Sequence, residues 1–300
     1  MPCPVAITFD DLPVMAFEDV PFRERADSAP ERALVSDRIL GTLARHGIPA
    51  AAFANTGRLR AGDGILRAWI DAGVEIGNHT ASHRSVDDGS LEGWKTDVLA
   101  CDAALREAVG RAVRYFRFPY LRTGAIAARK EEAADYLRTL GYRTVPATVT
   151  SAEWLLAHYY HLAWAGGDAG AMASVARLFV AHSVEALAAA RALARGTVGR
   201  EVPQIVLLHV NRLSADHLDA VLREWRARKH GFVTLEEALA DPVFALPDRY
   251  VGPRGGSWLL RVAGAVDRGP GGRPSWFDRE RDALLSRLQP IFGWPREAAT

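Results

Sequence analysis

Short apolar runs alternate with amphipathic stretches along most of the chain. The runs predict strands at 5–9, 50–55, 74–77, 115–118, 143–149, 204–210 and 232–235. The stretches between them predict helices at 30–46, 64–72, 90–110 and 129–140, and a glycine at or just after each helix favours its end there. Repeated strand–helix units favour a parallel sheet covered by helices. The pattern therefore predicts an α/β fold, a barrel of about seven strands.

Two stretches depart from this alternation. Residues 152–196 form one long helical region, rich in alanine, leucine and aromatic residues and interrupted by Gly166-Gly-Asp-Ala-Gly170. Residues 241–300 are rich in proline, glycine and tryptophan (Trp258, Trp276 and Trp294), with a last helical pattern at 279–288. We therefore expect a barrel over 1–240 with a helical insertion at about 152–196, and a C-terminal extension over 241–300 packed on the barrel.

Composition excludes some classes of protein. The 300 residues carry 37 basic and 36 acidic side chains, and no basic block suggests a nucleic-acid partner. The apolar stretches are shorter than a membrane span. Two cysteines, Cys3 and Cys101, make neither a disulfide framework nor a zinc cluster, so we expect buried or free thiols. We expect a cytoplasmic protein if Met1 is the native start, and a periplasmic or secreted one if a leader was removed. The sequence leaves the oligomeric state open.

Acidic and imidazole side chains gather at the ends of the predicted strands. Asp10 and Asp11 end the first strand, and adjacent carboxylates repel each other unless a cation or a shared proton relieves them. His79 and His83 follow the third strand, where a helical i, i+4 spacing would let both imidazoles share a cation. One carboxylate with two imidazoles leaves positions open for water and substrate. The spare carboxylate is a candidate general base.

Three further groups fall at strand ends, where α/β barrels carry their active sites. Arg117 can hold a carboxylate by paired hydrogen bonds and favour its ionised form. Pro119 stiffens the next turn, which would fix the direction of the Tyr120 backbone N–H as a donor to an oxyanion. His209 ends an apolar strand and suits a general acid that protonates a leaving nitrogen.

The region 152–196 offers a rival histidine pair, His158 and His161, inside an aromatic helix. No strand end lies beside it, so we interpret the pair as helix packing or as part of a substrate wall. The aromatic residues at one helix's spacing either line such a wall or pack on the barrel. They are Trp154, Tyr159, Tyr160 and Trp164.

Four motifs in order resemble the NodB-homology polysaccharide deacetylases, carbohydrate esterase family 4, over roughly residues 3–240. They are Thr8-Phe-Asp-Asp11, His79-Thr-Ala-Ser-His83, Arg117-Phe-Pro-Tyr120 and Leu207-Leu-His209. The resemblance implies a distorted (β/α) barrel and metal-dependent removal of N-acetyl, sometimes O-acetyl, groups from sugars. It also implies the role of each residue: Asp11, His79 and His83 as metal ligands, Asp10 as base, Arg117 as its partner, Tyr120 as oxyanion donor, and His209 as acid.

A further family motif is altered in this chain. Glu153, before Trp154, stands where the family has an aspartate that pairs with the catalytic histidine. Glutamate keeps the charge but is one methylene longer, so the pairing with His209 would survive with a shifted geometry. Thr150 replaces an earlier aspartate of the same motif. Val210 follows the histidine where the family often has aspartate, and Asn211 is a candidate replacement.

The sequence thus predicts a hydrolase that removes acetyl groups from oligo- or polysaccharides, with an acetylated carbohydrate as its partner. Zinc is the expected cofactor, although cobalt, nickel and iron tolerate the same ligands. Two alternatives stay open. One is a related amidase that opens a small cyclic amide, similar to allantoinase. The other is a carbohydrate-binding protein on a decayed catalytic barrel, favoured only by the altered motif.

Overall fold

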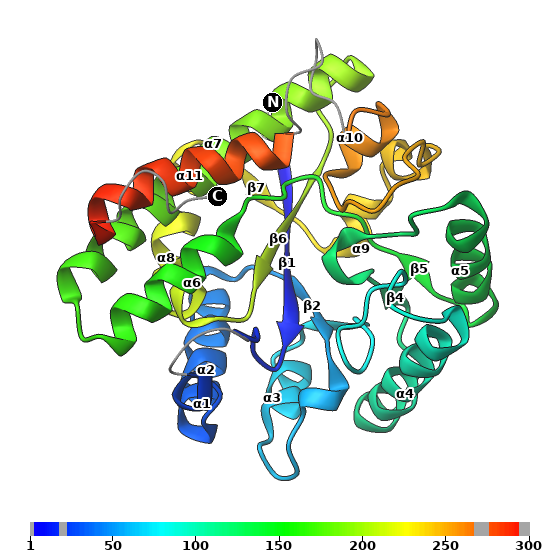
Figure 1. The fold of residues 1–300 in the computed structure, drawn as a ribbon, viewed down its shortest axis with the longest axis horizontal. Helices are drawn as coiled ribbons and strands as arrows, with labels where there is room; N and C mark the ends of the chain where they lie inside the picture. The colour runs from blue at the N-terminus through cyan, green and yellow to red at the C-terminus, as the bar shows by residue number, and fades with distance from the viewer. Residues whose placement is uncertain (1–2, 18–22, 267–275, 294–300) are drawn as a thin grey trace.

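The computed structural model describes residues 3–17, 23–266 and 276–293 (Figure 1). Met1 and Trp294, on which two of the expectations above depend, lie outside these ranges. The sheet strands are β1 (Pro4–Leu12), β2 (Ala50–Ala54), β3 (Glu75–Asn78), β4 (Tyr115–Phe116), β5 (Arg143–Thr144), β6 (Gln204–His209) and β7 (Gly231–Phe232). Among the described residues, strands alternate with helical segments up to residue 152, after which two helices follow each other without a strand between them.

The seven strands form one parallel sheet that curls on itself. Their order is β5-β4-β3-β2-β1-β6, with β7 paired to the start of β1. Beyond β5, Val149 makes a single bridge to Val206 in β6, so the two ends of the sheet approach each other. β1 is buried along nearly its whole length, as expected for a parallel strand covered on both faces. The predicted distorted (β/α) barrel is confirmed.

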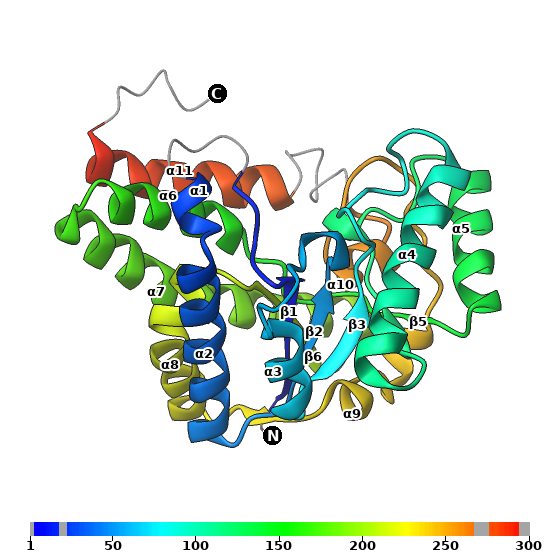
Figure 2. The same cartoon turned by 90° about the horizontal axis from the view of Figure 1, so that it is seen from below.

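Helices cover the barrel on the outside. They are α1 (Arg23–Ala26), α2 (Ala29–His46), α3 (Ile65–Asp71), α4 (Leu91–Val109), α5 (Ala127–Thr139), α6 (Glu153–Ala165), α7 (Ala169–Val198), α8 (Arg212–Ala227), α9 (Leu235–Leu239), α10 (Trp258–Val262) and α11 (Trp276–Phe292). Figure 1 shows α2, α6 and α8 on one side of β1, and α4 and α5 on the other. Figure 2 shows α11 running along α6 and α7, and α11 contacts α7.

Local sequence explains where these elements begin and end. α2 starts after Ser28 with a proline in its first turn, and it ends at Gly47, whose φ of 59° is the left-handed conformation that glycine adopts without strain. α8 is capped by the preceding Asn211, whose side-chain oxygen accepts from the backbone N–H of Ser214. The Asn211 cap also fixes the chain directly after β6, next to the strand end that carries His209.

Three predicted elements differ from the structure. Strand 143–149 is regular only over Arg143–Thr144, because Pro146 cannot donate to a sheet ladder and the chain regains a single bridge at Val149. Strand 232–235 ends at Phe232, since Thr234 forms a capping box that opens α9. The expected helical pairing of His79 and His83 is wrong. Residues 79–83 form a loop, in which His83 has a φ of 59°.

The long apolar region 152–196 forms two helices, α6 and α7, separated at Gly166 and Gly167. By length and composition alone, α7 is the one described helix apolar enough to suit a membrane span. Within its most apolar 18-residue stretch, 44% is buried inside the protein. Buried core helices have the same composition, so this bears only weakly on the predicted absence of a span. Cys3 and Cys101 are both free and buried, as expected. The proposed division into a barrel and a C-terminal extension stays a prediction.

Candidate active site

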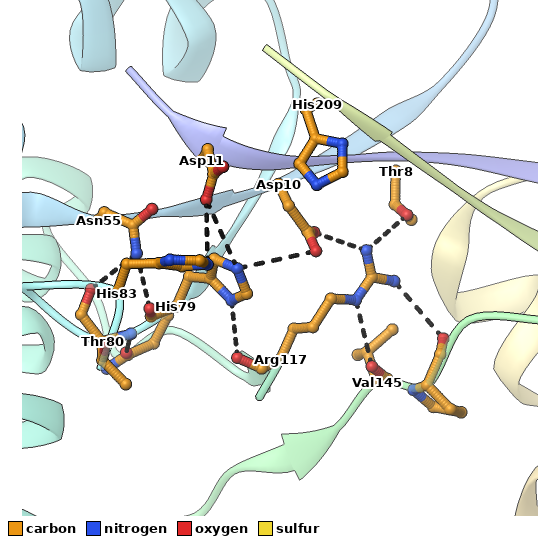
Figure 3. A network of polar contacts seen from close by, with 12 residues as sticks. Thr8, Asp10, Asp11, Asn55, His79, Thr80, His83, Arg117, Val145 and His209 are labelled. Carbon is orange, nitrogen blue, oxygen red and sulfur yellow. Dashed lines mark hydrogen bonds and ion pairs between the residues drawn. The ribbon is translucent and has the colours of Figure 1, made fainter. Parts of the chain in front are cut away.

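The carboxyl ends of β1, β3, β4 and β6 bring together most of the side chains singled out from the sequence (Figure 3). Asp10 pairs in register with His209 on the neighbouring strand β6. His79 follows β3, and Arg117 follows β4. These strands are parallel, so their carboxyl ends open onto the same end of the barrel. A shared strand end thus places residues that are up to about 200 positions apart in sequence within one cluster.

Asp11, His79 and His83 form a group that fits a metal ion. One ligand atom from each lies within 4.8 Å of the others, and the described residues contain no second group of this kind. Asp11 Oδ1 lies 3.4 Å from His83 Nε2 and 3.8 Å from His79 Nε2, and this buried oxygen has no hydrogen-bond partner. Ligand atoms around a tetrahedral zinc are separated by roughly 3.4 Å. The spacing and the orphaned oxygen therefore suit a shared cation better than direct hydrogen bonds.

His79 is held in the form that a metal ligand requires. Its Nδ1 lies 2.8 Å from the carbonyl oxygen of Arg117, so Nδ1–H donates there and leaves Nε2 facing Asp11. Burial of the ring, followed by the nearby charge of His83, lowers the pKa of His79 to about 3. A neutral imidazole with its second nitrogen fixed is ready to donate a lone pair to a cation.

The backbone of the site adopts an uncommon conformation. Six non-glycine residues among those described have positive φ, and five of them belong to the site loops; the five are Asp11 (64°), Thr80 (62°), His83 (59°), Tyr120 (58°) and Leu121 (54°). Such conformations cost free energy and persist only where the surroundings enforce them. Asn55 is one enforcing residue, since its Nδ2 donates to the carbonyl oxygens of His79 (2.7 Å) and Thr80 (3.2 Å).

Asp10 is paired with a fully buried arginine. Arg117 donates from Nη1 to Asp10 Oδ1 (2.7 Å) and to Thr8 Oγ1 (2.7 Å), and from Nε to the carbonyl oxygen of Val145 (3.2 Å). The other carboxylate oxygen of Asp10 faces His79 Nε2 at 3.7 Å. One oxygen of Asp10 is thus committed to the arginine, and the other points towards the candidate metal position.

His209 is paired with Glu153, the residue of the altered motif. Its Nδ1 lies 2.8 Å from Glu153 Oε2, and the second carboxylate oxygen accepts from Asn211 Nδ2 (2.6 Å) and Ser214 Oγ (3.3 Å). Burial lowers the pKa of His209, but the hydrogen bond and charge of Glu153, with smaller contributions from Asp11 and Asp10, outweigh it and raise the pKa to about 9. His209 therefore carries a proton near neutral pH.

Tyr120 lies beside the candidate metal position, in the turn Pro119–Leu121, with its ring centroid 4.4 Å from that of His83. The rival histidine pair lies elsewhere. The ring of His161 is 4.3 Å from that of Phe17, and its Nδ1 bonds to the carbonyl oxygen of Ala157. The structure thus places His161 in helix packing, as interpreted.

Three residues of the site were not assigned a role from the sequence. Thr8 holds Arg117, Asn55 holds the histidine loop, and Ser214 holds Glu153. Asn55 carried a usable signal, because it is the polar last residue of a predicted strand. Thr8 carried a weaker one as a polar position within an apolar run, and Ser214 had none.

The fold and this cluster define a class: a parallel (β/α)-barrel protein with a carboxylate–imidazole cluster at the carboxyl ends of its strands. The model of a known family, described as polysaccharide deacetylase, matches residues 2–145. The match covers 144 of the 300 residues and bears out, over this part of the chain, the resemblance that the motifs predicted.

Solved structures of carbohydrate esterase family 4 share the fold. A chitin deacetylase from the fungal pathogen Colletotrichum lindemuthianum matches with 17% identity and a TM-score of 0.54, over 80% of this chain and 88% of that one. A family 4 acetyl xylan esterase from Clostridium thermocellum, in complex with a cobalt ion, matches with 19% identity and a TM-score of 0.52, over 78% and 89%. A pseudoenzyme of the family from Bacillus anthracis matches with 16% identity and a TM-score of 0.51, over 79% and 66%.

Proposed function

We propose that this protein is a metal-dependent hydrolase that removes acetyl groups from N-acetylated sugars. The observation that carries the proposal is the buried, unpartnered Asp11 Oδ1 between two imidazoles, beside a second carboxylate held by Arg117. Asp11, His79 and His83 would hold the metal, with zinc as the expected ion. The cobalt ion in the acetyl xylan esterase supports a divalent metal here without settling its identity.

A divalent metal at this position would lower the pKa of a water molecule and polarise the acetyl oxygen. Asp10 accepts the proton of the attacking water through the oxygen not bonded to Arg117. The Tyr120 backbone N–H donates to the oxygen on which negative charge develops. His209, whose Nδ1 is bonded to Glu153, donates its Nε2 proton to the departing sugar nitrogen.

An acetate-release screen tests this function directly. The purified protein is incubated with chitooligosaccharides, peptidoglycan and acetylated xylan, with and without a chelator. We expect acetate from at least one N-acetylated substrate, loss of release with chelator, and recovery when zinc is added back. Release that persists in chelator after the bound metal has been shown to be gone would contradict the metal-dependent mechanism.

The same screen separates the alternatives. Cyclic ureides, assayed by ring opening, test an allantoinase-like activity. The family likeness includes a pseudoenzyme, so sugar binding without hydrolysis is also measured, by titration of the metal-loaded protein with the oligosaccharides. Ring opening without acetate release, or binding without turnover of any substrate, would replace the proposed function.

The pH profile of Glu153→Gln tests the acid role of His209. The pKa of His209 is about 9, so kcat/KM of the wild type stays high below that pH and falls as pH rises through it. Glutamine removes the charge that opposes burial, and the pKa falls to the ordinary value of 6.5 or below. At pH 8 a group of pKa 6.5 is about 3% protonated, so kcat/KM falls roughly 30-fold there and less at pH 6.

A bound cation would lower the pKa of His209 in both forms of the protein, so the direction of the difference holds. Glu153→Asp is the matched variant, because it keeps the charge and is expected to keep most of the alkaline shift. Identical alkaline limbs for the wild type and Glu153→Gln would show that His209 is not the acid.

A further inference from the structure

The turn that carries Tyr120 is strained and needs support from outside. Tyr120 and Leu121 both adopt left-handed conformations, with φ of 58° and 54°. Within the turn, the backbone N–H groups of Leu121 and Arg122 bond to Phe118 and Pro119. Two consecutive non-glycine residues in this region are held only where neighbouring structure enforces them.

Arg261 of α10 supplies one contact to this turn. Its side chain is buried, and Nη1 lies 3.4 Å from the carbonyl oxygen of Leu121 while Nη2 bonds to the hydroxyl of Thr123. Asp248 Oδ2 accepts from Arg261 Nε (3.1 Å) and Nη2 (2.7 Å), and the guanidinium lies over the ring of Tyr250. The planar guanidinium is thereby oriented on one side by the Asp248 carboxylate, and on the other side it contacts Leu121 and Thr123 of the active-site loop.

Gly255 supplies a second contact, directly at Tyr120. A Cβ atom at this position would lie 1.8 Å from the carbonyl oxygen of Tyr120 and 3.2 Å from Leu121 Cβ. The φ of Gly255 lies outside the left-handed region, so close approach of two backbones, rather than conformation, requires glycine here. The backbone at Gly255 therefore packs directly against Tyr120, the residue whose N–H the proposed mechanism uses.

The segment that makes these contacts is itself anchored to the barrel at two places. Lys130 Nζ in α5 donates to the carbonyl oxygens of Asp248 (2.8 Å) and Tyr250 (2.7 Å). Ser257 Oγ donates to the carbonyl oxygen of Thr148 (2.7 Å), and the Trp258 N–H donates to that of Ala147 (2.7 Å). These anchors lie on either side of Gly255 in sequence, so they hold the contact from both ends.

We propose that residues 248–261 clamp the turn Pro119–Leu121 and that Arg261 is a positioning residue for Tyr120. The reaction role rests on the proposed function, whereas the clamp does not. The residues lie beyond the span of the family match, so this part of the chain contributes to the site by a route that the family motifs do not contain. The clamp sets the direction of the Tyr120 N–H. The histidine ligands are held separately, by Asn55 and the Arg117 carbonyl.

The test is Arg261→Met in the full chain, with Arg200→Gln as the matched control. Arg200 also pairs with an aspartate, Asp241, but its side chain is exposed and donates to Asp241 and the Glu201 carbonyl rather than to the turn. We expect amide hydrogen exchange at residues 120–123 to rise about tenfold or more in Arg261→Met, because the turn opens locally. We expect kcat to fall roughly 10- to 100-fold with unchanged metal content, as misplacement of a donor predicts. The control changes neither.

The double variant Asp248→Asn with Arg261→Met separates positioning from charge balance. It removes the half-buried carboxylate that the single variant leaves with Lys130 (3.0 Å) as its ion-pair partner, so part of the lost thermal stability recovers, while the contacts to Leu121 and Thr123 stay lost. We expect exchange at 120–123 and kcat to remain altered. Recovery of both to wild-type values would show that Arg261 only neutralises Asp248, and would overturn the proposal.

Gly255→Ala gives a second route that leaves the ion pair between Arg261 and Asp248 intact, should Arg261→Met fail to fold. It pushes directly on the Tyr120 carbonyl, and we expect the same rise in exchange and fall in kcat. Unchanged exchange at 120–123 in every folded variant of Arg261 and Gly255 would refute the clamp. If the wild type releases no acetate while the variants still alter exchange, the proposed function fails and the clamp stands.

Discussion

Asp10→Asn lowers kcat for acetate release by roughly 10²–10⁴-fold, the range typical for loss of a general base. The variant protein keeps its metal, because the ligand group Asp11, His79 and His83 is untouched. The amide retains the shape of the carboxylate and can still accept from Arg117, so the fold around β1 is preserved. What it lacks is a carboxylate oxygen able to take a proton from water. Metal content by elemental analysis and kcat by acetate release are the measurements.

Asp102→Asn is the matched control for this experiment. Asp102 is also buried and also paired with an arginine, Arg106, but it lies on α4 and accepts from Tyr142 rather than facing the site. We expect its kcat to equal that of the wild type. If Asp10→Asn retains full activity, Asp10 is not the base and the proposed division of labour between Asp10 and Asp11 is wrong. If Asp10→Asn loses its metal, Asp10 is itself a ligand.

The barrel was predictable because parallel strands buried on both faces leave a plain signal. β1, β2 and β6 are short apolar runs, and glycines mark the helix ends between them. Prediction failed where a local preference was overridden. The spacing of His79 and His83 suits a helix, but Asn55 bonds to the carbonyl oxygens at 79 and 80 and thereby diverts the chain into a loop. Such a contact from another strand end has no counterpart in the periodicity of the segment itself.

The sequence allowed the location of the site residues, at the carboxyl ends of the strands, to be predicted. It did not allow the contacts that hold them in place to be predicted. The position of each group after an apolar run indicates which end of the barrel it occupies, and this placed Asp10, Arg117 and His209 together. Their supports could not be predicted, because they depend on packing between distant segments. Ser214 reaches Glu153 only because the cap of α8 folds back on α6. Arg261 reaches Leu121 across 140 positions.

His79→Ala is expected to remove both the metal and the activity. His79 is almost completely buried and is locked by its bond to the Arg117 carbonyl, so removing its imidazole leaves one position at the metal without its ligand. Losing a partner that only supports a ligand typically weakens metal binding about 10–100-fold. Loss of the ligand itself should cost more, and acetate release should fall to background. A competition titration with a metal indicator measures the affinity.

Thermal unfolding distinguishes metal loss from a damaged fold in His79→Ala. A ligand that binds only the folded state raises the unfolding temperature in proportion to the logarithm of its concentration over its Kd. Added zinc should therefore stabilise the wild type and His46→Ala, a control at a helix end where the imidazole pairs with Asp219. It should not stabilise His79→Ala, even if that variant unfolds cooperatively at a similar temperature without metal. Equal stabilisation of His79→Ala by zinc would place the metal elsewhere in the chain and remove the basis for the proposed chemistry.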